Sequence, residues 1–483
     1  MLFNSIDFAI FLPIVFLMYW FVFHKNLKLQ NILIVVISYF FYAWWDWRFL
    51  SLIIFSTLVD YTIGLKLENE KKQLKRKILL WVSILVNLGC LGFFKYYNFF
   101  LDNFITAFSY FGMHIKTNNL NIILPIGISF YTFQTLSYTI DVYHKKLKPT
   151  KDLIVFSAFV SFFPQLVAGP IERASNLLPQ FTKKRIFNNE NAIKGIRLIL
   201  WGLIKKVVIA DSLAPTVNDI FTNFSQYPSS ILLLGTFFFS FQIYCDFSGY
   251  SMIARGVAKL FGFELMTNFK YPYFSRSIGE FWRKWHISLT TWFRDYLYIP
   301  IGGSRVSKLK TIINVCIVFL VSGFWHGANW TFIAWGGLHA LLFIPAILTT
   351  KKNRIKDHIS LNAFKLPSLS DSIRILCTFC LVSFCWIFFR ADSIDTAILF
   401  IQKILLFNFE SINYLNPYDN QPLGIEYLFL SVFILVEYLL ATKTISLYSK
   451  NRTKGIFIDA VLFLIITFSA QICSNLSFIY FQF

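Results

Sequence analysis

Long apolar stretches alternate with short polar segments along the whole 483-residue chain. Most stretches have the length, about 17–20 residues, that a helix needs to cross a bilayer core of about 30 Å. A membrane barrel would instead show segments of about ten residues in strict alternation. The pattern therefore predicts an all-α polytopic membrane protein. The twelve predicted crossings are 8–23, 29–45, 49–65, 78–94, 122–140, 195–213, 229–245, 311–326, 328–349, 372–389, 424–441 and 456–474.

The basic residues orient these crossings. Of the 45 Lys and Arg residues, 36 lie in loops that are cytoplasmic if the N-terminus lies outside, and five lie in the outer segments. This is the positive-inside rule, so we expect both termini to be extracytoplasmic. The net charge of +20 is then mainly a topology signal and does not indicate a nucleic-acid partner. Binding of an anionic donor such as coenzyme A is a second use for part of it.

Three segments break the simple pattern of spans. The apolar run 153–168 has basic loops on both sides, which predicts that it re-enters the membrane, with a turn over 163–173. Pro125 and Gly127 disturb the start of the crossing 122–140, and irregular backbone at membrane depth is tolerated only in protein or beside a wet cavity. The stretch 124–134 is therefore a candidate cavity wall. The aromatic piece 96–111 is predicted to lie along the surface.

A histidine within an apolar run is the first candidate for chemistry. His326 lies in the stretch 322–330, between Gly323 and Gly327 and close to tryptophans that include Trp325. A polar ring at membrane depth is costly and marks a functional site by default, although a neighbouring helix can also satisfy such a histidine. Asn329, one turn on, would orient the ring if the backbone there is helical.

A second histidine lies in the cytoplasmic stretch 246–310. Ser277 and Glu280 have the spacing of a capping box, which predicts a helix over 278–298 that stops before Pro300. Five side chains share one apolar face of that helix: Trp282, Trp285, His286, Leu289 and Phe293. His286 is thus either a core residue or, together with His326, part of a site. His339 is interpreted as a packing or hydrogen-bonding residue.

Two lysines near the middle of the crossing 195–213 are expensive unless they pair or face water. Lys205 and Lys206 are therefore candidates for a polar cavity, with Asp211 as a partner for one of them, although five residues separate Asp211 from Lys206.

The chain contains no other chemistry-bearing motif. The seven cysteines give no disulfide framework, and Cys377 and Cys380 have no matching pair for a metal. Serine-nucleophile and phosphate-loop motifs are absent. A neutral imidazole in an apolar site can take a hydroxyl proton, which suits attack of an alcohol on an acyl thioester.

Several long motifs resemble the membrane-bound O-acyltransferases, in particular the bacterial alginate O-acetyltransferase branch. The resemblance extends from the first span to the last. The segments that carry it most clearly are 281–289 (FWRKWHISL), 292–303 (WFRDYLYIPIGG) and 325–330 (WHGANW), joined by 163–173, 202–211 and 242–250. One departure is Met252, which stands where the branch usually has an aspartate.

The resemblance implies a ring of about 11–12 transmembrane helices, with re-entrant and amphipathic helices, around a central channel. His326 matches the principal catalytic histidine and His286 the second one. We expect the following residues to bind substrate: Trp285, Trp325, Asn329, Arg294, Lys205 and Lys206. No metal and no permanently bound cofactor are expected. The donor would be acetyl-CoA or another acyl thioester, the acceptor an extracytoplasmic polysaccharide, and the partners the lipid bilayer and a periplasmic or surface-anchored acetyltransferase.

The chain is predicted to form one acyltransferase domain, 1–483, with its catalytic core at about 122–349. Two alternatives stay open. One is D-alanyl transfer from a carrier-protein thioester to teichoic acid. The other is a non-enzymatic polysaccharide export subunit, although the sequence shows no obvious internal repeat of the kind that transporters usually have.

Overall fold

The computed structural model describes residues 1–113, 119–166, 169–349, 366–409, 424–448 and 452–470, and the elements in these ranges are helices. Each of the twelve predicted crossings overlaps one of them. Six helical stretches of the described residues are long and apolar enough to cross a membrane, and four shorter apolar helices accompany them. The prediction of an all-α polytopic membrane protein is confirmed. The central channel stays a prediction.

The chain divides into two compact units, which are considered separately. The first comprises Met1–Ile199 and Ile253–Met266, and the second Leu200–Met252 and Thr267–Phe483. Two long helices, α10 (Asn189–Leu203) and α12 (Ser229–Leu260), continue from one unit into the other. The single acyltransferase domain with a core at about 122–349 stays a prediction.

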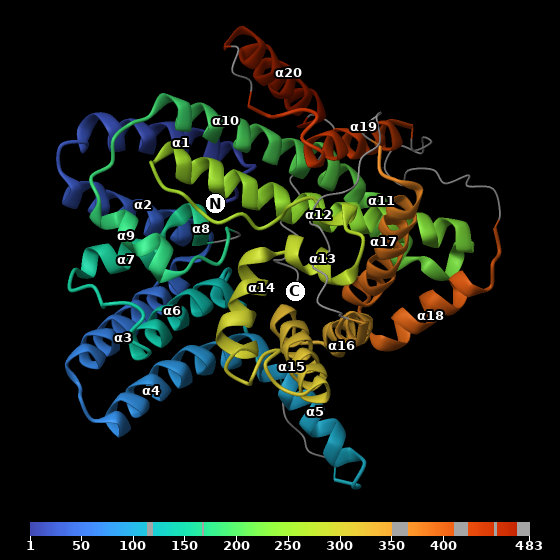
Figure 1. The fold of residues 1–483 in the computed structure, drawn as a ribbon, viewed down its shortest axis with the longest axis horizontal. Helices are drawn as coiled ribbons and strands as arrows, with labels where there is room; N and C mark the ends of the chain where they lie inside the picture. The colour runs from blue at the N-terminus through green and yellow to red at the C-terminus, as the bar shows by residue number, and fades with distance from the viewer. Residues whose placement is uncertain (114–118, 167–168, 350–365, 410–423, 449–451, 471–483) are drawn as a thin grey trace. The chain divides into compact units, whose positions relative to one another are not determined.

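The first unit is built around a buried carboxylate. Its remaining helices are α1 (Ile6–Leu17), η1 (Met18–Val22), α2 (Leu27–Asp46), η2 (Trp47–Phe49), α3 (Leu50–Asn69), α4 (Gln73–Leu91), η3 (Gly92–Tyr96), α5 (Tyr97–Ser109), α6 (Ile128–Tyr143), α7 (Leu153–Ser161), α8 (Phe163–Leu166) and α9 (Ala174–Thr182). Helices α3, α4 and α6 lie beside one another (Figure 1).

Asp60 of α3 is fully buried among these three helices. Its carboxylate accepts hydrogen bonds from Ser83 (2.5 Å) and Asn87 (2.8 Å) of α4 and from Thr139 of α6 (3.2 Å). Buried polar groups at membrane depth must find partners inside the protein, so these side chains fix which helices pair.

The interrupted segments are helical in pieces. Gly127 adopts a left-handed conformation (φ 77°), and α6 begins only after it. The predicted re-entrant segment contains α7 and α8, separated at Phe162, and it is buried from Val155 to Leu166. Helix α4 continues through η3 into α5, and α5 forms most of the aromatic piece 96–111. Its surface position, the re-entry and the cavity wall stay predictions. Residues 351–371 and 408–423, which connect predicted crossings, lie largely outside the described residues.

The second unit contains the two candidate histidines. Its remaining helices are η4 (Ile204–Ala210), α11 (Asp211–Thr222), η5 (Phe224–Gln226), η6 (Pro272–Phe274), α13 (Ile278–Lys284), α14 (Ile287–Phe293), η7 (Arg294–Tyr298), α15 (Lys308–His326), α16 (Trp330–Thr349), α17 (Leu369–Arg390), α18 (Ile394–Leu405), α19 (Gly424–Ala441) and α20 (Arg452–Ala470).

Helices α15 and α16 of this unit lie side by side (Figure 1). A Cβ on Gly323 would collide with the carbonyl oxygen of Phe332, and one on Gly336 with that of Phe319. Small residues let two membrane helices approach at backbone distance. This approach sets the position of the C-terminal end of α15, where His326 lies.

Candidate active site

The segment that carries His286 is two short helices, so the expected unbroken helix over 278–298 is wrong. The predicted cap at Ser277 is confirmed, because its Oγ accepts a hydrogen bond from the Glu280 amide (3.2 Å). Helix α13 then ends at Lys284, and α14 begins at Ile287. No glycine or proline stands between Glu280 and Pro300 to signal the break. It arises because His286 has a left-handed backbone (φ 42°), and the amide of Ile287 bonds outside the helix.

The break turns the His286 side chain into an aromatic pocket. The imidazole is 1% exposed. Its ring centroid lies 4.6 Å from that of Phe247, 6.4 Å from that of Phe269 and 6.1 Å from that of Trp325. His286 itself, with the flanking helices α13 and α14, lies outside the apolar stretches that are long enough to cross a membrane. Burial lowers the pKa of His286 to about 3, so the ring is neutral near pH 7.

His326 is the last residue of α15 and is also buried. Its ring lies 5.0 Å from Trp325, 5.1 Å from Trp335 and 5.3 Å from Phe389. The centroids of the two histidine rings, His286 and His326, are 6.4 Å apart. Residues 40 positions apart in the sequence thus meet in one buried, aromatic place, which we take as the candidate active site.

A third histidine borders the same aromatic cluster. The Nε1 of Trp282 donates a hydrogen bond to Nδ1 of His339 (3.3 Å), and the ring of Trp335 lies between His339 (5.0 Å) and His326 (5.1 Å). The interpretation of His339 as a packing and hydrogen-bonding residue is confirmed.

Asn329 does not meet the condition for orienting His326. Helix α15 ends at His326 and α16 begins at Trp330, so the residues between them are not helical. The Asn329 amide instead donates to the carbonyl of Asp392 (2.8 Å) and accepts from the amide of Thr331 (3.0 Å). Trp325 does lie against the imidazole. Trp330 is 54% exposed. The second tryptophan ring beside His326 is that of Trp335.

Two further candidates, Trp285 and Arg294, have surroundings of their own. Trp285 is buried against Trp386, with ring centroids 5.0 Å apart. Arg294 is mostly exposed and forms an ion pair with Asp295 at 2.7 Å. A role in substrate binding stays a prediction for both residues, as it does for Trp325 and Asn329.

Lys206 has two buried carboxylate partners. Its Nζ lies 2.7 Å from Asp211 and 2.8 Å from Asp246. The five-residue spacing from Lys206 to Asp211 fits because η4 is a π-helix, in which each amide bonds five residues back. The pairing with Asp211 is confirmed. The sequence reasoning missed Asp246, although an acidic residue at the end of an apolar run is itself a signal.

Lys205 is held by a residue far along the chain. Its Nζ lies 2.9 Å from Glu437 of α19 and 3.2 Å from the hydroxyl of Tyr244, and that hydroxyl donates to Glu437 at 2.6 Å. Sequence reasoning also missed Glu437, an acidic residue inside an apolar span. Both lysine ammonium groups therefore have internal counter-charges, and their binding of substrate stays a prediction.

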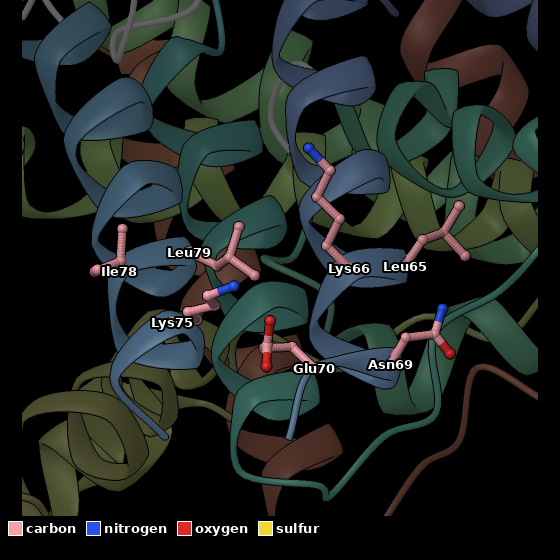
Figure 2. A pocket seen from close by; sticks show the side chains of 7 residues that line it. All are labelled: Leu65, Lys66, Asn69, Glu70, Lys75, Ile78 and Leu79. Atoms are coloured by element: carbon pink, nitrogen blue, oxygen red, sulfur yellow. The ribbon is translucent and has the colours of Figure 1, made fainter. Parts of the chain in front are cut away.

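The structure has two hollows whose linings contain no histidine, one in each unit. One, of about 490 Å³, lies between the end of α3 and the start of α4 (Figure 2). Its lining residues are Leu65, Lys66, Asn69, Glu70, Lys75, Ile78 and Leu79. The other, of about 350 Å³, lies in the second unit and includes Tyr244 and Glu437 in its lining. Among the described residues, no group of three His, Cys, Asp or Glu side chains has the arrangement of a metal site.

Several known proteins are similar to this chain over most of its length. The model of the membrane-bound O-acyltransferase family matches residues 147–354. The probable alginate O-acetylase of Azotobacter vinelandii is 38% identical over 91% of this chain and 85% of its own length. The peptidoglycan O-acetyltransferase of Helicobacter pylori is 35% identical over 86% and 82%. The teichoic acid D-alanyltransferase of Streptococcus thermophilus is 31% identical over 50% and 62%.

Proposed function

Because the chain belongs to the membrane-bound O-acyltransferase family, we propose that it transfers an acetyl group from a cytoplasmic thioester to hydroxyls of an extracytoplasmic polysaccharide. The enzyme is a multi-pass membrane O-acyltransferase, and its reaction requires an acyl donor. The donor in this proposal is acetyl-CoA or another acyl thioester. The observation that carries the proposal is the pair of buried imidazoles, His286 and His326, with ring centroids 6.4 Å apart.

His326 is the general base of the proposed reaction. It stands at the C-terminal end of the crossing 311–326, and the charge distribution assigns this end to the outer side of the membrane. The imidazole takes the proton of the acceptor hydroxyl while that oxygen attacks the thioester carbonyl. The carbon–sulfur bond breaks, the thiolate leaves toward the cytoplasm, and the proton passes to it. No net proton is consumed.

His286 serves the donor side of the same reaction. It lies in the cytoplasmic stretch 246–310 of the predicted topology, and its burial keeps the ring neutral, so it can donate one hydrogen bond and accept another. Its role is to hold the thioester and to pass the proton to the leaving thiolate. The topology of this proposal has both termini outside, in a bacterial inner membrane. A periplasmic or surface-anchored partner acetyltransferase either receives the acetyl group first or acts beside the enzyme.

Purified protein in proteoliposomes tests the proposal. With radiolabelled acetyl-CoA supplied on the cytoplasmic face and polysaccharide on the other, thioester cleavage should be accompanied by labelled O-acetyl ester. The His326→Ala variant is the matched control. Movement of polysaccharide without thioester turnover would instead favour an export subunit.

D-Alanyl transfer is the second candidate, supported by the similarity to the streptococcal D-alanyltransferase over half of the chain. The same proteoliposomes should be offered a D-alanyl carrier-protein thioester. Turnover of that donor, with none of acetyl-CoA, would replace the acetyl proposal.

A further inference from the structure

The backbone at His286 needs an external support. His286 is the N-cap of α14, and its side chain makes no capping hydrogen bond. Its φ of 42° lies in the left-handed region, which a non-glycine residue keeps only when the surrounding structure holds it there. The first amides of a helix also have no partner within the helix. Something outside α14 must therefore accept them.

Asn268 supplies both acceptors. Its backbone carbonyl accepts a hydrogen bond from the amide of Ile287 (2.9 Å), and its side-chain Oδ1 accepts one from the amide of Ser288 (3.3 Å). The residue is 1% exposed. Its Nδ2 has no hydrogen-bond partner among the described residues, so what the side chain contributes to this contact is its acceptor oxygen.

The chain next to Asn268 holds the other side of the break. The ring of Phe269 stacks on that of His286, with an angle of 16° between the ring planes. The amide of Lys270 donates to the carbonyl of Lys284 (3.0 Å). The segment 268–270 thus bonds to the backbone on both sides of His286 and contacts its ring.

We propose that Asn268 is a positioning residue for His286: its carboxamide holds the left-handed turn that places the imidazole beside His326. It acts through the backbone and touches no reacting atom. The inference rests on the proposed function, in which His286 serves the donor side of the transfer.

Substitutions of Asn268 separate the acceptor oxygen from side-chain size. Asn268→Leu has a similar volume and no acceptor, and it should lower kcat per molecule about 10- to 100-fold, as expected for a displaced catalytic group, with the donor KM changed less than about twofold. Asn268→Asp keeps an acceptor at the start of the helix and should recover the rate to within about fivefold. Equal losses in the Asp and Leu variants would overturn the proposal.

A double-mutant cycle distinguishes positioning from general support of the fold. In the His286→Ala background, Asn268→Leu should cost less than about twofold, because the ring that it would misplace is gone. A full loss in both backgrounds contradicts the proposal. The matched control is Asn314→Leu, since Asn314 is also buried and donates one hydrogen bond, to the carbonyl of Gly303 (3.1 Å). It should leave kcat per molecule within about twofold.

Hydrogen–deuterium exchange keeps this test independent of the reaction. In peptides that cover 285–290, exchange should be faster in Asn268→Leu than in wild type, Asn268→Asp or Asn314→Leu. Unchanged exchange in Asn268→Leu refutes the proposal that Asn268 holds the turn at His286. A wild-type enzyme that turns over no acyl thioester refutes the proposed function, while the exchange result still decides whether Asn268 holds the turn.

Discussion

At the scale of single residues, the two histidines of the candidate active site have different neighbours. His326 ends a membrane helix beside Trp325, Trp335 and Phe389. His286 caps a short helix beside Phe247. The pair therefore provides two imidazoles in one apolar place, which is an arrangement suited to moving a single proton.

Removing the proposed base should nearly abolish the reaction. General-base catalysis is typically worth about 10²–10⁴-fold, and we expect a loss of that size in O-acylation by His326→Ala. His326→Gln keeps similar size and hydrogen bonding without basicity, so it should be almost as inactive. Ester content of the surface polymer and membrane abundance of the protein should be measured together. An active Gln variant at normal abundance would mean that the residue only holds hydrogen bonds.

The pH dependence of the reaction should be independent of His286. Burial lowers its pKa to about 3, so the ring is neutral from about pH 5 to pH 8 and gains no proton in that range. The profile of kcat in His286→Gln should therefore have the same shape as in wild type, at a lower level. If the substitution removes an ionisation between pH 5 and pH 7.5, His286 is not buried as a neutral ring in the working enzyme.

At the scale of elements, buried charges and glycines determine which helices meet. Lys205 connects η4 with Tyr244 of α12 and Glu437 of α19. Lys206 connects it with α11 and α12 through Asp211 and Asp246. Segments far apart in the sequence are thereby joined at the part of α12 whose Phe247 contacts His286.

The ion pair between Lys205 and Glu437 should be costly to halve and cheap to replace. Lys205→Met and Glu437→Leu each leave a buried charge without its partner, so each should destabilise the protein by about 3–5 kcal/mol. The double variant should recover most of that loss, because apolar groups of similar size replace the pair. Thermal unfolding in detergent measures all three.

The control for this prediction is Glu190→Gln, which breaks the exposed pair with Lys194. It should cost less than about 1 kcal/mol. A double variant that is as unstable as the sum of the two single ones would show that the ion pair is not the relevant interaction.

For the whole molecule, the charge distribution predicts how the chain is threaded through the membrane. The turn between α3 and α4 belongs to a basic loop. The segment 214–228, which the structure shows as most of α11 followed by η5, contains no Lys or Arg. The rule for basic residues places the first inside and the second outside.

Cysteine labelling in intact cells measures this threading. In a variant without native cysteines, Lys72→Cys should be protected from an impermeant thiol reagent, and Ser225→Cys should react with it. Reaction at position 72 would invert the proposed topology. Reaction at both positions after the cells are opened is the control for accessibility.

The sequence alone determined the features that depend on local composition. Apolar runs of membrane length became helices, the N-cap at Ser277 formed, and His326 stood out because an imidazole is costly in an apolar run. Contacts between residues far apart in the chain could not be predicted from the sequence. Asp246 and Glu437 were missed as lysine partners, because a carboxylate in a span does not say which cation it faces.

Only the tertiary structure decided the backbone conformation of His286 and which residues surround it. The sequence 280–299 has no helix breaker, so periodicity predicted one helix. The break exists because Asn268, eighteen positions earlier, accepts the first amides of α14 and holds a left-handed residue. The same contact turns His286 toward His326. Hydrophobic period is a local property of the chain, whereas hydrogen bonds that compensate backbone strain come from segments that only the fold brings together.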